Sequence, residues 1–96
     1  MHYKLMSFSI TIENIYKVKG YESIVTGKIE KCDDDISIQD GQSFNIEISS
    51  GYIGKGLYPV YGHKTSLLKI NEYFTIAITS KINIPFQIGD IVKVTL

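Results

Sequence analysis

The sequence predicts an all-β fold, closed into a small antiparallel β-barrel. Apolar and polar residues alternate with period two along much of the chain, which is typical of strands that bury one face. Turn-forming residues separate these runs at roughly 8–12-residue spacing, the pattern of a barrel or a sandwich. Closure is favoured because 44 % hydrophobic residues in an open sheet would leave long edges free to pair with other chains.

The alternation falls into distinct runs in which branched or aromatic residues occupy every second position. In the first run, Phe8, Ile10 and Ile12 alternate with serine, threonine and glutamate. Each run predicts one strand with its apolar side chains on the barrel interior. The strands are expected near residues 7–13, 36–39, 44–49, 74–79, 81–84 and 91–96.

Turns are expected where glycine, asparagine and aspartate stand between the runs, because these residues accept positive φ or bond the turn backbone. Helix is nearly excluded, since no segment keeps an apolar stripe at i, i+3, i+4 and i+7. The best helical candidate, Ser66–Tyr73, is short and consists largely of β-branched or polar residues. The expected turns lie at 20–22, 33–35, 40–41, 51–56, 71–72 and 89–90.

The composition bounds the chain to one domain, residues 1–96, with zero formal net charge and ten lysines but no arginine. Zero net charge argues against a strongly basic nucleic-acid binder, and arginine is the usual bidentate reader of phosphates and guanine edges. No apolar run approaches the roughly 20 residues of a membrane span, and no secretory signal is recognisable. With a single cysteine, Cys32, and no zinc-like cluster, we expect a cytoplasmic protein without metal or cofactor.

A more specific pattern lies in residues 12–30. Its second half reads IVTGKIE, residues 24–30, and resembles the V-V-T-G-[RK]-[VI]-E strand in the second domain of translational GTPases such as elongation factor Tu. The preceding IENIY resembles that family's I-E-D-V-F strand, and residues 86–92 resemble its closing G-D element. Gly27, inside the expected strand, marks a bulge or a close backbone approach at a barrel corner.

The resemblance extends from about residue 8 to residue 94 and implies a six-stranded barrel of the translation-protein type. In those relatives the barrel is not catalytic and contacts RNA or ribosomal surfaces. The 96 residues leave no room for the GTPase domain of that family, so we expect a standalone barrel without nucleotide binding. The segment 52–64 has no counterpart in the family, and the hairpin after Glu30 is longer and more acidic than in the relatives.

The most unusual stretch, residues 51–64, holds four glycines, three tyrosines, two lysines and a histidine. Interleaved aromatic and basic residues stack bases and hold phosphates, and tyrosine is also enriched at protein interfaces. The alternative that we favour is a loop and one strand whose tyrosines cover a barrel end, with Pro59 at an edge or bulge. The candidate binding residues are Tyr52, Lys55, Tyr58, Tyr61, His63 and Lys64.

Three weaker patterns have ordinary structural explanations. Residues 16–21 combine two tyrosines with two lysines, and Lys28 follows; this indicates either an RNA-facing patch or, as we favour, a solvated hairpin. Residues 33–35 are three aspartates without the spacing of a calcium loop. Residues 62–65, GHKT, lack the spacing of a phosphate-binding loop. No nucleophile, histidine and acid are arranged for catalysis, so we expect no enzyme.

Taken together, these patterns predict a non-catalytic binding module. Zero net charge, the missing arginine and the tyrosine-rich segment favour a protein partner. The family resemblance favours the alternative, a translation-linked protein that binds RNA or the ribosome. A membrane or nucleotide partner is not expected.

Overall fold

The computed structural model describes residues 6–33, 36–59 and 65–96. These ranges contain eight β-strands and no helix. The strands are β1 (Ser7–Tyr16), β2 (Ser23–Cys32), β3 (Ser37–Gln39), β4 (Ser43–Ile48), β5 (Ile53–Leu57), β6 (Thr65–Leu67), β7 (Tyr73–Ile78) and β8 (Ile91–Thr95).

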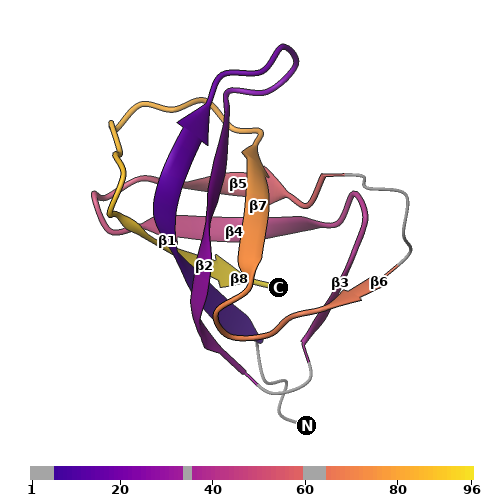
Figure 1. The fold of residues 1–96 in the computed structure, drawn as a ribbon. Helices are drawn as coiled ribbons and strands as arrows, with labels where there is room; N and C mark the ends of the chain where they lie inside the picture. Colours follow the sequence, from indigo (N-terminus) through magenta and orange to yellow (C-terminus); the bar gives the residue numbers. More distant parts are fainter. Residues whose placement is uncertain (1–5, 34–35, 60–64) are drawn as a thin grey trace, which may run out of the picture.

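Six of the strands close into an antiparallel barrel in the order β1-β2-β7-β5-β4-β8 (Figure 1). The last strand, β8, pairs with β1 on one side and with β4 on the other, and these two pairings close the barrel. The short strands β3 and β6 pair only with each other and form a two-stranded ribbon beside the barrel. The predicted small closed barrel of six antiparallel strands is therefore confirmed.

The barrel interior is filled by the apolar face of each strand. Phe8, Ile10 and Ile12 of β1 are all buried, as the alternation in this strand predicts. Aromatic rings occupy one region of this core, where Phe74 packs edge-on to Phe8 at 4.9 Å between ring centroids. The same Phe74 ring stacks against Tyr58 at 5.0 Å, so a residue outside the barrel strands also belongs to the core.

Two β-bulges interrupt the pairing of β1 with β2. In the first, Ser9 pairs with Lys31 but Ile10 pairs with Ile29, which leaves Glu30 without a partner in β1. Because an extra residue shifts the alternation by one position, both Glu30 and Lys31 face solvent. The bulge thereby turns Lys31 outward on the same side of the sheet as Ser9.

The second bulge lies next to Gly27 and leaves Glu13 as the extra residue of β1. Gly27 pairs with Ile12, and a Cβ atom built on Gly27 would lie 1.8 Å from the carbonyl oxygen of Thr11. No side chain fits in that space. The predicted close backbone approach at this glycine is confirmed.

Two predictions of secondary structure were wrong. The run at 81–84 is part of the loop between β7 and β8, not a strand (Figure 1). Ile82 of this loop packs against the core, but closure of the barrel leaves no barrel edge with which the run could pair. The expected turn at 51–56 ends early, because β5 begins at Ile53 and Pro59 follows that strand.

The sequence pattern missed β5 because its inward positions are glycines. A Cβ on Gly54 would lie 2.3 Å from the hydroxyl oxygens of both Tyr52 and Ser80. A Cβ on Gly56 would lie 2.9 Å from a methyl carbon of Ile76. The side chains of Tyr52, Ser80 and Ile76 fill the space beside these glycines. The sequence of β5 therefore lacks the alternation of apolar and polar residues by which a strand is recognised.

Candidate functional site

The structure places Tyr52, a predicted binding residue, inside the protein. Its side chain is 0 % exposed, and its hydroxyl donates to the carbonyl oxygen of Ser80 at 3.1 Å. A second, short hydrogen bond of 2.5 Å joins the same hydroxyl to Ser80 Oγ, and Ser80 Oγ accepts the backbone N–H of Lys55 at 2.8 Å. Tyr52 thus fastens the start of β5 to the loop after β7. Its ring has no surface left for a partner, so we assign Tyr52 to the core.

Tyr58 is also a core residue, 8 % exposed and stacked on Phe74. Its backbone exchanges hydrogen bonds with the turn before β4, donating to Gln42 and accepting from Gly41. Lys55 is exposed, and its Nζ donates to Asn45 Oδ1 at 2.5 Å, so its binding role stays a prediction. The three remaining candidates, Tyr61, His63 and Lys64, lie outside the described residues.

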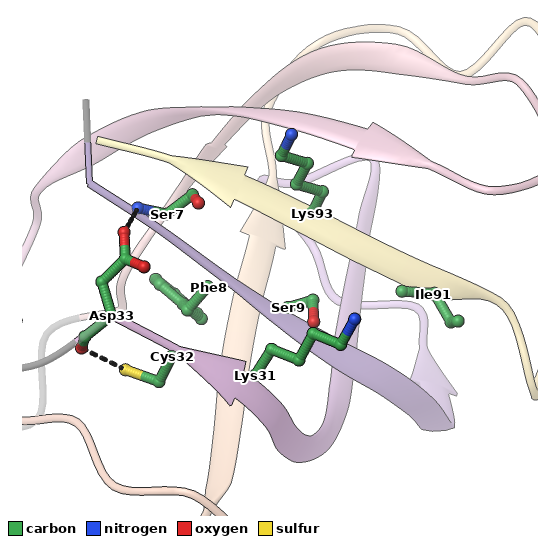
Figure 2. A pocket seen from close by; sticks show the side chains of 8 residues that line it. All are labelled: Ser7, Phe8, Ser9, Lys31, Cys32, Asp33, Ile91 and Lys93. Atoms are coloured by element: carbon green, nitrogen blue, oxygen red, sulfur yellow. Dashed lines mark hydrogen bonds between the residues drawn. The ribbon is translucent and has the colours of Figure 1, made fainter. Parts of the chain in front are cut away.

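An open groove of about 480 Å³ lies along the outer side of β1, β2 and β8 (Figure 2). At one end, Asp33 Oδ2 accepts the backbone N–H of Ser7 at 3.1 Å, and the Cys32 thiol donates to the carbonyl oxygen of Asp33 at 3.2 Å. The bond from Ser7, together with that from the Asp33 N–H to the Ser7 carbonyl at 3.3 Å, holds the start of the loop after β2 against the first residue of β1. The groove is lined by Ser7, Phe8, Ser9, Lys31, Cys32, Asp33, Ile91 and Lys93.

The middle of the groove is a row of outward side chains on adjacent strands. Ser9 pairs with Lys31 on one side and with Lys93 on the other, so the serine lies between two lysines (Figure 2). Lys93 in turn pairs with Glu47 of β4. In Figure 2 the Lys93 side chain points away from Ser9, so the two ammonium groups are separate, and together with Glu47 the row presents both signs of charge. Sequence reasoning missed this row because the bulge at Glu30 is what turns Lys31 outward.

The hairpin tip, residues 16–21 between β1 and β2, extends beyond one end of the barrel (Figure 1). Tyr16, Val18 and Tyr21 there are 48 %, 44 % and 39 % exposed. The hairpin tip thus exposes three large side chains within six residues, and tyrosine is a residue type that is enriched at protein contacts.

Hydrogen bonds accepted by main-chain carbonyl oxygens hold the hairpin tip in place. The Tyr21 N–H donates to the Val18 carbonyl at 3.3 Å, and the Ser23 hydroxyl donates to the Tyr16 carbonyl at 3.3 Å. The N–H of Glu22 donates to the carbonyl of Ile78 at the end of β7 and fixes the hairpin to the barrel. The exposed side chains are thus presented by a backbone that is already ordered, which lowers the entropy lost on binding.

Lysines accompany the aromatic residues of the hairpin tip, as the sequence indicated. Lys17 and Lys19 are exposed there, and Lys17 Nζ approaches the Glu22 carbonyl at 3.5 Å. Lys28, by contrast, lies farther along β2, with its Nζ 5.7 Å from the centre of the Tyr73 ring. Lys28 therefore belongs to the barrel wall, and the lysines of the hairpin tip are Lys17 and Lys19.

Other kinds of site find no support in the described ranges. There, no three His, Cys, Asp or Glu side chains gather in a way that could hold a metal ion. The described part of the chain also has no helix with the length and hydropathy to cross a membrane. Comparison with protein-family models, curated proteins and solved structures gave no significant match to this chain.

Proposed function

We propose that this chain is a non-catalytic binding module that contacts a partner protein through the hairpin tip. The observation that carries the proposal is the shared exposure of Tyr16, Val18 and Tyr21 on a hydrogen-bonded hairpin. Tyrosines are enriched among the residues that dominate binding energy at protein interfaces. Lys17 and Lys19 surround these side chains with positive charge, so the partner surface is expected to be apolar with an acidic rim.

The second candidate function is the one that the family resemblance favours, a translation-linked contact with RNA or the ribosome. The observation in its favour is that residues 16–21 expose two tyrosines and two lysines, since such side chains stack bases and contact phosphates. Zero net charge and the absence of arginine weigh against it. We therefore place the protein partner first.

Affinity capture with matched variants tests the two candidates. The immobilised wild-type chain and a Tyr16→Ser/Tyr21→Ser variant are incubated with lysate of the source cells, with and without nuclease. Tyr73→Ser is the control, because Tyr73 is 59 % exposed but lies on the barrel wall at the start of β7. The substitutions leave the hairpin ordered, since the bonds that hold it use main-chain atoms of residues 16 and 21.

The expected result is one stoichiometric, nuclease-resistant protein, retained by the wild type and by the Tyr73 variant but lost from the double variant. Truncation of an anchoring tyrosine weakens binding by about 2 kcal/mol or more, roughly 30-fold for each residue. Nuclease-sensitive capture of ribosomal material would contradict the proposal of a protein partner and would support the RNA or ribosome contact. Equal capture by all three proteins would contradict a role for the hairpin tip.

A further inference from the structure

A second surface of the barrel has a charge pattern that is complementary to itself. On the outer side of β5, β4, β8 and β1, the residues Ile53, Glu47, Lys93 and Ser9 stand in one row through successive cross-strand pairs. We call this row, together with Ile91, the β4–β8 face. We propose that two copies of this chain associate through the β4–β8 face as a symmetric dimer.

The central pair of the row is an acid next to a base. Glu47 and Lys93 are both exposed, and within the described residues neither forms an ion pair. An acidic foreign partner would be repelled by Glu47, and a basic one by Lys93. A second copy, turned by 180°, meets neither repulsion, because it presents a lysine to the glutamate and a glutamate to the lysine.

The apolar residues of the face project beside hollows that can receive them. Ile53 is 74 % exposed and Ile91 is 49 % exposed, so both side chains are available for contact with a second copy. A shallow hollow of about 430 Å³ lies between β4 and β8, and the groove of about 480 Å³ lies on the other side of β8. Ile91 and Lys93 line both, so the two hollows adjoin on either side of β8.

The symmetry operation fixes which residues meet. A two-fold axis parallel to the strands, between Glu47 and Lys93, reverses the order of the row in the second copy. Glu47 of each copy then faces Lys93 of the other, which gives two ion pairs. Strands are spaced about 4.8 Å apart, so the same operation brings Ile53 opposite Ser9 of the other copy. Ser9 lies in the groove (Figure 2).

The inference is independent of the proposed function, because the hairpin tip lies at the end of the barrel and the β4–β8 face lies on its wall. A dimer would display two hairpin tips and would raise the avidity for a repeated partner. The contact between two convex barrels is small, so we expect a weak dimer, populated at about 0.1–1 mM.

Sedimentation equilibrium on the full chain tests the proposal through charge reversal. Glu47→Lys and Lys93→Glu are each expected to weaken dimerisation roughly tenfold or more, since each places like charges opposite one another. An equimolar mixture of the two variants is expected to associate again, because a face with two carboxylates meets a face with two ammonium groups. Neither variant regains its own missing charge in the mixture, so renewed association must come from contact between the two molecules. A variant that had lost its fold would not associate in this way.

The contact made by Ile53 is tested by the same sedimentation measurement. Ile53→Ser is expected to abolish the dimer, whereas Ile88→Ser serves as the matched control, because Ile88 is 64 % exposed but lies in the loop before β8, outside the row. A monomeric wild type at about 1 mM would overturn the proposal. Failure of the mixed charge variants to associate, or a dimer unaffected by Ile53→Ser, would also overturn it, and none of these results bears on capture through the hairpin tip.

Discussion

Replacing Gly27 with alanine puts a methyl carbon where the backbone of β1 already lies. The added Cβ would stand 1.8 Å from the carbonyl oxygen of Thr11 and 2.7 Å from the carbonyl carbon. Such atoms do not approach within about 3 Å, so β1 and β2 must move apart by more than an ångström. Gly27→Ala is therefore expected to be strongly destabilising even though alanine is the smallest possible addition.

The neighbouring strand cannot move away easily, which sets the magnitude. On its other side, Ile12 donates to the Asp90 carbonyl at 2.9 Å and accepts from the N–H of Gly89 at 2.8 Å. Overpacking of a tight core costs about 1–3 kcal/mol, and each displaced ladder hydrogen bond adds about 1 kcal/mol. We expect Gly27→Ala to lower the free energy of unfolding by about 3–5 kcal/mol.

Urea denaturation and thermal melting measure this effect. For a domain of this size each kcal/mol lowers Tm by about 4–8 °C, so a fall of about 12–40 °C is expected. Gly20→Ala is the matched control, because a Cβ on Gly20 meets nothing within 4 Å and suffers only from its φ of +101°. The control is expected to lose about 1–2 kcal/mol. A Gly27→Ala variant no less stable than the Gly20→Ala variant would refute the close approach.

Two further predictions concern positions whose roles the tertiary structure defines. Tyr52→Phe removes both hydrogen bonds to Ser80, and we expect the free energy of unfolding to fall by about 1–2 kcal/mol in urea titration. An unchanged urea midpoint would show that these bonds do not fasten β5. Asn71 has a φ of +73°, so Asn71→Ala is expected to lower Tm by more than Asn71→Gly does, a difference of about 1 kcal/mol. Equal melting temperatures for the two Asn71 variants would contradict a left-handed turn at that position.

The strands with clear alternation were predictable because burial on one side of a sheet follows directly from the two-residue period. The first run, residues 7–13, corresponds to the start of β1, which runs from Ser7 to Tyr16. Turn chemistry was equally local: Gly20, Gly41 and Gly89 adopt positive φ where turns were expected. The strand at residues 24–30 came from the family resemblance and lies within β2.

The candidate site was less predictable, because exposure depends on neighbours that are distant in the sequence. Tyr52 is buried because Ser80, 28 residues later, provides its hydrogen-bond partner. Tyr58 is buried because Phe74 lies against its ring. A tyrosine in a glycine-rich segment is compatible with either a surface or a core position, and the local sequence does not distinguish the two.

The sequence by itself determined the class of the fold, since period-two patterning is a local property, and it marked Gly27 as a bulge or a close backbone approach. Only the tertiary structure decided the strand order, the course of β5 and the row that joins Ile53 to Ser9. Those features depend on which strands become neighbours when the barrel closes. Closure also leaves the run at 81–84 in a loop, because a strand needs a partner and this barrel has no edge left to offer one.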